Sequence, residues 1–162
     1  FDGPIAIRYP RGSAHQGLRE YQAPVEYGRS EIIRKGKKIA VLGVGSMIPS
    51  CMKICKGLKD DGYDPTFVNA RFVKPLDVDL LDELAKDHSL FVTVEENVKS
   101  GGYGEHVSAY MEACHPEIRV LSAAVWDRFV PQGNVESLRS RIGLGVEDIR
   151  QAIEDSEELR EQ

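Results

Sequence analysis

Two arginines near the start of the chain form its most compact positively charged motif. They belong to the run Arg8-Tyr9-Pro10-Arg11-Gly12, which follows a short apolar stretch and reads as a loop because of its proline and glycine. Two guanidinium groups beside a glycine suit a doubly charged phosphate, which arginine can bind through two parallel hydrogen bonds. From the residues alone, Arg8 and Arg11 form either a phosphate site or part of a solvated, salt-bridged linker.

A second candidate site lies at Glu95 and Glu96, which end a strongly apolar run and precede Gly101-Gly102, Glu105 and His106. Open α/β sheets bind their ligands at the carboxyl ends of their strands, so acid and base chemistry could be placed here. Adjacent carboxylates on a strand point to opposite faces, however, and do not converge on one substrate without a twist. We therefore expect these glutamates to anchor a loop or to contact a subunit.

A glycine turn, Gly43-Val44-Gly45-Ser46, joins an expected strand to an expected helix. Dinucleotide-binding proteins hold a phosphate on backbone amides at such a turn, but the third glycine of their motif is missing. We favour a tight turn that lets strand and helix pack closely. The alternative is a regulatory site that binds a small anion near Gly45, Arg71 and Glu95.

The loop from Asp127 to Gly133 follows Trp126 and mixes large apolar side chains with a charged pair. Such a surface often contacts a partner. The sequence is equally consistent with a loop that folds its aromatic rings onto its own core.

The three cysteines, Cys51, Cys55 and Cys114, include no C-x-x-C pair. Their odd number fits reduced thiols in a cytoplasmic protein better than a disulfide framework. Only His115 lies near Cys114 as a further ligand, so we expect ordinary apolar packing and no metal site.

The elements that position these residues follow from alternating apolar segments after Gly28. Continuous apolarity from Ile39 to Val44 is typical of a central parallel strand. Strands are expected at 30–34, 39–44, 66–70, 90–94 and 118–123, with helices starting at Ser46, Asp77 and Asn134, and others around 107–114 and 146–153. Val78 is expected to face inward.

This order predicts a three-layer α/β/α fold with about five mostly parallel strands. The first two strands flank Lys35-Gly36-Lys37 and are expected to pair as a hairpin, which adds one antiparallel edge. Residues 1–27 do not fit the pattern. They read as the end of a preceding domain, with a small strand at Ile5-Ala6-Ile7, followed by a linker.

Length and charge restrict the possible functions. A chain of 162 residues suits one ordinary core, and neither a signal peptide nor a membrane span is recognisable, so we expect a soluble fragment. The net charge of −5 equals the charge of residues 147–162, where seven acids face two arginines. A neutral body with an acidic tail argues against binding to nucleic acid, and without a recognisable membrane span we expect no membrane partner.

The segment Asn69-Ala70-Arg71-Phe72-Val73-Lys74-Pro75-Leu76-Asp77 resembles the strand-to-helix connection of the transketolase C-terminal domain. This domain is shared by transketolases, pyruvate dehydrogenase beta subunits and deoxyxylulose phosphate synthases. Three further segments look like the synthases in particular: residues 8–12, the run from Val92 to Gly104, and the loop from Asp127 to Gly133. The resemblance extends from Gly3 to about Ile153, and it implies a transketolase C-terminal-like domain at 28–162 after the end of a pyrimidine-binding domain at 1–27.

The resemblance implies that the parent enzyme is a cytoplasmic homodimer that joins pyruvate and glyceraldehyde 3-phosphate with loss of carbon dioxide. The product is a precursor of isoprenoids, thiamine and pyridoxal. Thiamine diphosphate, held through Mg²⁺, supplies the carbanion chemistry from the missing domains. The resemblance gives this chain no catalytic and no cofactor-binding residue. It assigns the aldehyde's phosphate to Arg11, with Arg8 as the second candidate, and a scaffolding role to the domain.

Overall fold

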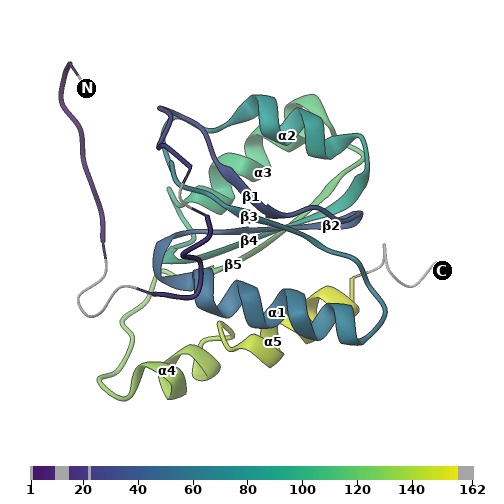
Figure 1. The fold of residues 1–162 in the computed structure, drawn as a ribbon. Helices are drawn as coiled ribbons and strands as arrows, with labels where there is room; N and C mark the ends of the chain where they lie inside the picture. Colours follow the sequence, from purple (N-terminus) through teal and green to yellow (C-terminus); the bar gives the residue numbers. More distant parts are fainter. Residues whose placement is uncertain (1, 10–14, 22, 157–162) are drawn as a thin grey trace.

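The computed structural model describes residues 2–9, 15–21 and 23–156, which form three layers around a central sheet (Figure 1). Helices α2 (Val78–Ala85) and α3 (Tyr103–Cys114) cover one face, and α1 (Ile48–Asp60) and α5 (Val146–Glu154) cover the other. The strands are β1 (Glu31–Arg34), β2 (Lys38–Gly43), β3 (Thr66–Asn69), β4 (His88–Val98) and β5 (Arg119–Val125). The three-layer α/β prediction is confirmed.

The strand order is β1-β3-β2-β4-β5, and every neighbouring pair is parallel except β1 with β3. The mostly parallel sheet with one antiparallel edge strand is therefore confirmed. The expected hairpin between the first two strands is wrong, because β3 lies between them. The connection passes over the start of β3, where Gly36 donates its N–H to Thr66 Oγ1 and Lys37 donates its own to the Asp64 carbonyl. A Cβ at Gly36 would overlap the Asp64 carbonyl at that crossing.

The central strand β2 divides its side chains between two cores. Ile39 and Val41 pack with α1 and α5, whereas Ala40 and Leu42 pack with α2 and α3. All four side chains are fully buried. The unbroken apolar run therefore reflects a strand covered on both faces, as the sequence predicts.

Two of the three predicted helix starts are confirmed. Asp77 accepts a hydrogen bond from the Leu80 amide at the start of α2, and Asn134 caps α4 (Val135–Arg141) in the same way. Ser46 does not cap α1: it lies in a 3-10 turn, Gly45–Met47, and its hydroxyl donates to Glu96. Val78 is 38% exposed, so the expectation that it faces inward is also wrong.

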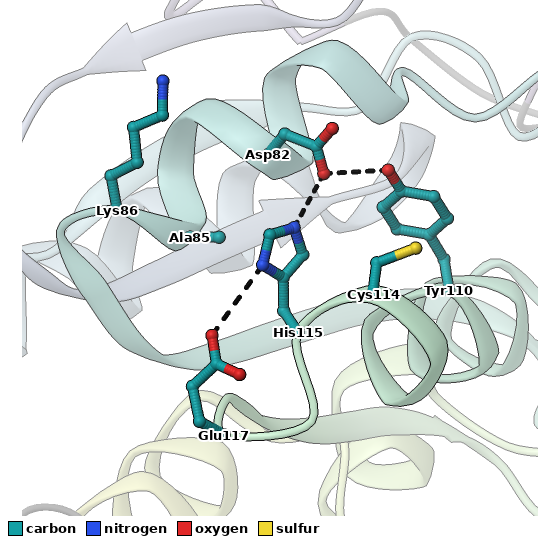
Figure 2. Close-up of a pocket in the computed structure, with 7 residues that line it drawn as sticks. All are labelled: Asp82, Ala85, Lys86, Tyr110, Cys114, His115 and Glu117. Carbon is teal, nitrogen blue, oxygen red and sulfur yellow. Dashed lines mark hydrogen bonds and ion pairs between the residues drawn. The ribbon is translucent and has the colours of Figure 1, made fainter.

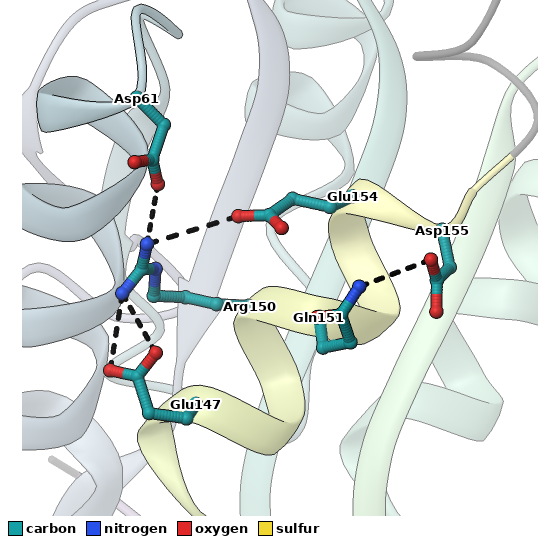
Figure 3. Close-up of polar contacts among 6 residues, drawn as sticks. All are labelled: Asp61, Glu147, Arg150, Gln151, Glu154 and Asp155. Atoms are coloured by element: carbon teal, nitrogen blue, oxygen red, sulfur yellow. Dashed lines mark hydrogen bonds and ion pairs between the residues drawn. The ribbon is translucent and has the colours of Figure 1, made fainter.

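Arg150 joins α5 to α1, the two helices on one face of the sheet (Figure 3). Its guanidinium lies 2.5 Å from Asp61 at the end of α1, 2.8 Å from Glu147 and 3.8 Å from Glu154. A Cβ on Gly57 would come within 2.6 Å of Arg150 Nε, so the absence of a side chain at Gly57 lets the two helices approach.

The segment before the domain runs beside the layers without joining the sheet (Figure 1). The predicted strand at Ile5-Ala6-Ile7 is not formed, because its apolar side chains find no partner strand and Ile5 and Ile7 are exposed. The proposed boundary at residue 28 stays a prediction. Across the described ranges, no helix has the length and apolarity needed to cross a bilayer.

Candidate functional site

The carboxyl edge of the sheet gathers most of the residues singled out from the sequence. Glu95 and Glu96 lie near the carboxyl end of β4, and the Gly45-Ser46 turn follows β2. Arg71 follows β3, and the loop that begins at Trp126 follows β5. In parallel sheets these strand ends lie at one edge, which is where a ligand site is expected.

Glu95 is 1% exposed and holds the start of α3. Its two carboxylate oxygens accept the backbone N–H groups of Tyr103, at 2.9 Å, and Gly104, at 2.8 Å. A carboxylate here satisfies helix amides that would otherwise be unpaired and complements the positive end of the helix dipole. Gly102 must lack a side chain, because a Cβ there would come within 2.6 Å of Glu95 Oε1. Glu95 is thus a structural anchor.

Glu96 points to the opposite side and joins three further segments. Its carboxylate accepts a hydrogen bond from Ser46 Oγ at 2.7 Å and from Arg139 Nε, on α4, at 3.1 Å. Its main-chain oxygen accepts from Arg8 Nη2, also at 3.1 Å. We call Arg8, Ser46, Glu96 and Arg139 the Glu96 junction. The opposite directions of the two glutamates match the sequence expectation, and both anchor loops.

The electrostatics of the Glu96 junction favour an ionised carboxylate. Partial burial pulls the pKa of Glu96 upward, but the hydrogen bonds from Arg139 and Ser46 and the charges of Arg139 and Arg8 outweigh it. The pKa of Glu96 is therefore held below its ordinary value. A general base at neutral pH needs a raised carboxylate pKa, so Glu96 is suited to ion pairing instead.

The linker before β1 is bound along the same edge. Arg71 donates to the carbonyls of Ala23 and Pro24, at 3.4 Å each, and forms an ion pair with Glu31 at 2.5 Å. The Tyr27 ring meets Phe72 edge-on, with 5.7 Å between centroids. These contacts engage Arg71 within the chain itself.

Asp77 secures the last residues of this linker. It binds Arg29 at 2.9 Å and the Ser30 amide at 2.7 Å while it caps α2. Asp79 adds a second ion pair with Arg29 at 2.6 Å. The carboxyl edge therefore holds the preceding segment in place.

The predicted phosphate residues have different outcomes. Arg8 lies exposed at the carboxyl edge, hydrogen-bonded to Glu96 as described above. Arg11 falls outside the described residues, so its assignment stays a prediction. The contributions of Ser46 and Arg139 were not foreseen, and no local signal links Arg139 to a partner 43 positions earlier.

The alternative anion site near Gly45, Arg71 and Glu95 finds little support in this geometry. The α2 and α3 amino termini are occupied by the chain's own carboxylates, Asp77 and Glu95. The first turn of α1 contains Pro49, which has no N–H to offer. Negative groups already placed at these helix ends would repel an incoming anion.

A hollow of about 570 Å³ opens near the amino ends of β4 and β5, between α2 and α3 (Figure 2). Within it, His115 lies between Asp82, at 2.8 Å, and Glu117, at 3.8 Å, and the Tyr110 hydroxyl also donates to Asp82. The hydrogen bond to Asp82 raises the pKa of Tyr110 to about 12. These polar groups satisfy one another at the edge opposite to the one where such sheets bind ligands.

The cysteines divide between core and surface. Cys51 and Cys55 are buried on α1, and burial raises the pKa of Cys55 to about 12 and that of Cys51 further. Cys114 is exposed beside the amino-edge hollow, so the expectation of apolar packing is wrong for it, because α3 ends there. Among the described residues, no group of three or more His, Cys, Asp or Glu side chains could hold a metal ion.

The loop after β5 exposes its large apolar side chains. Trp126 is 55% exposed and Phe129 fully so, Val130 is also exposed, and so is Val135 at the start of α4. Lys99 Nζ lies 4.8 Å above the Trp126 ring. We call Trp126, Phe129, Val130 and Val135 the apolar patch. Of the two readings of this loop, folding of the aromatic rings onto the core is wrong.

Comparison with known proteins identifies the fold. Residues 28–149 match the family model described as "Transketolase, C-terminal domain". The chain belongs to the transketolase C-terminal domain family. This transketolase C-terminal domain is 42% identical, over 92% of the chain, to 1-deoxy-D-xylulose-5-phosphate synthase of Lachnoclostridium phytofermentans. It is 39% identical, over 94% of the chain, to the same enzyme of Dictyoglomus thermophilum. The resemblance found from the sequence motifs is confirmed.

The transketolase C-terminal domain spans about a quarter of these relatives, 24% and 25% of their lengths. Among solved structures, it resembles a chain titled "Split gene transketolase, inactive beta4 tetramer" with a TM-score of 0.75 and 28% identity, over 84% of this chain and 44% of that one. A transketolase from Campylobacter jejuni shares the fold at a TM-score of 0.56 and 16% identity, over 80% of this chain and 19% of that one.

Proposed function

We propose that this chain is the carboxy-terminal domain of a 1-deoxy-D-xylulose-5-phosphate synthase and acts there as a scaffold without its own catalytic centre. The parent joins pyruvate and glyceraldehyde 3-phosphate with release of carbon dioxide. The proposal is supported by the similarity to such synthases over more than nine tenths of the chain. Because the chain covers a quarter of their length, most of the parent lies in other domains.

The geometry of the carboxyl edge is the observation that carries the scaffold role. Its helix termini, its two glutamates and Arg71 all bind other parts of this chain, including the linker. Because the polar groups at this edge bind other parts of the same chain, they can hold the preceding domain in position, and few of them remain to take part in catalysis.

Thiamine diphosphate and Mg²⁺ do not fit the described residues. Diphosphates are commonly held by free backbone amides at helix amino termini, and the α2 and α3 amino termini at this edge are capped by Asp77 and Glu95. A magnesium ion needs converging carboxylates, and the described ranges contain no such cluster. We assign both cofactors to the other domains of the parent.

The apolar patch supports a docking role toward those domains and the twin subunit. Phe129 contributes an entirely exposed aromatic side chain, which a soluble surface seldom keeps without a partner. The patch follows the end of β5, and β5 lies beside the end of β4 that carries Glu96, because Val98 of β4 pairs with Val125 of β5. The preceding domain, whose end meets the junction through Arg8, is therefore the expected neighbour.

Calorimetric titration of the purified chain with thiamine diphosphate and Mg²⁺ tests this proposal, together with an assay of pyruvate decarboxylation. The full-length parent serves as the positive control. We expect heat of binding and turnover from the parent alone. Micromolar binding or measurable turnover by the isolated chain would refute the scaffold role.

A further inference from the structure

Arg139 and Arg8 approach the same residue, Glu96, through different atoms. Arg139 binds the carboxylate through Nε, whereas Arg8 reaches the main-chain oxygen with a single Nη2 group. The second carboxylate oxygen accepts the Ser46 hydroxyl. Both oxygens of the only acidic side chain in the Glu96 junction are thus occupied, and neither of them by Arg8.

This division leaves most of the Arg8 guanidinium available. An arginine side chain carries five N–H donors, and within the described ranges Arg8 uses one of them on Glu96. A phosphate takes a guanidinium through two parallel N–H groups, so an arginine already paired with a carboxylate is a poor phosphate ligand. The state of the Glu96 carboxylate therefore decides what Arg8 can bind.

We propose that Arg139 is a positioning residue for the substrate phosphate: by pairing with the Glu96 carboxylate, it keeps the Arg8 guanidinium free for the phosphate of the aldehyde. This inference rests on the proposed function and on the resemblance to the synthases, which assigns that phosphate to Arg11, with Arg8 as the second candidate. It adds a contribution of the carboxy-terminal domain to substrate affinity. Arg139 acts through Glu96 and Arg8 and does not touch the substrate.

Loss of Arg139 has a defined consequence. The Glu96 carboxylate then lacks its cationic partner, and Arg8, already hydrogen-bonded to the main chain of the same residue, is the nearest replacement in the junction. A carboxylate and a phosphate compete for the same two N–H groups. The affinity for the phosphorylated aldehyde falls, while chemistry on the bound substrate is unchanged.

The experiment uses the full-length parent with Arg139→Gln, Glu96→Gln and the double variant. Arg139→Gln is expected to raise the KM for glyceraldehyde 3-phosphate by about fivefold to tenfold, with kcat and the KM for pyruvate unchanged. The double variant is expected to return that KM to within about twofold of the wild type, because the competing charge is gone. The KM for unphosphorylated D-glyceraldehyde should not respond to Arg139→Gln.

Three further variants separate this mechanism from a structural effect. Arg141→Gln removes an exposed arginine from the same helix, α4, and is the matched control. Arg139→Lys keeps a cation beside Glu96, and we expect it to retain most of the affinity. It also provides the test if Arg139→Gln does not fold. Arg8→Met removes the phosphate ligand itself and should raise the aldehyde KM in every background.

The outcomes distinguish the inference from the proposed function. If Arg8→Met leaves the KM for the phosphorylated aldehyde unchanged, both the phosphate role of Arg8 and the positioning role of Arg139 are wrong. If Arg8→Met raises it but Arg139→Gln does not, only the positioning role is wrong. A rise in KM that the double variant does not reverse also overturns the inference, because Arg139 would then act independently of Glu96.

Discussion

Replacement of Glu95 by alanine should destabilise the domain strongly. The buried carboxylate accepts two backbone N–H groups, from Tyr103 and Gly104, and at 1% exposure the side chain is closed off from bulk solvent. Hydrogen bonds to a charged group contribute about 1.5–3 kcal/mol each, so the loss of both lowers the free energy of unfolding by about 3–6 kcal/mol. For a chain of this size the melting temperature falls on the order of 10 °C.

Chemical denaturation of the purified chain, followed by circular dichroism, measures this effect. Glu105→Ala is the matched control, since Glu105 accepts the Gly101 amide at 2.5 Å but is exposed in the first turn of α3. We expect it to cost less than about 1 kcal/mol. A Glu95→Ala loss no larger than that of Glu105→Ala would show that Glu95 does not anchor α3.

Three other outcomes follow from the packing. Gly104→Ala should lower the free energy of unfolding, measured by urea denaturation, by about 1–2 kcal/mol, because the new Cβ would lie 2.5 Å from Thr93 Oγ1 and overlap Ser122 Oγ. Adding Ser122→Ala should recover part of that stability, and no recovery would contradict this cause. Burial lowers the pKa of His88 in the folded chain, so as the pH falls His88 is protonated in the unfolded chain before it is protonated in the folded one. Stability should therefore fall below about pH 6.5, less steeply in His88→Gln, and equal slopes would count against this assignment. Arg150→Met should lower the melting temperature by a few degrees, and the difference should shrink in 1 M salt; a difference that persists would indicate packing instead of ion pairing.

The sequence predicts the parts of this fold that depend on local patterns. The uninterrupted apolar run of β2 predicts a central strand, and Asp77 and Asn134 predict helix starts because capping requires only nearby residues. Pairing of β1 is decided by tertiary structure, and the hairpin signal around Gly36 fails because the connection crosses β3.

The candidate site shows the same division. The opposite orientations of Glu95 and Glu96 follow from strand geometry and are predictable. Their partners are not, because Ser46 and Arg139 lie 50 and 43 positions from Glu96 and meet it only after the chain has folded. A serine expected to cap a helix, such as Ser46, can instead give its hydroxyl to a distant carboxylate, which no local rule anticipates.

Docking of this domain onto the rest of its parent is the central claim, and Phe129→Ser tests it most directly. Phe129 is fully exposed in the isolated chain, so the substitution should change the chain's own stability by less than about 0.5 kcal/mol. In the full-length parent, where we expect the ring to be buried, it should cost about 1.5–3 kcal/mol in the unfolding transition of this domain. Val78→Ser, at an exposed position on α2, is the control. Equal effects of Phe129→Ser on the isolated chain and the parent would contradict the account.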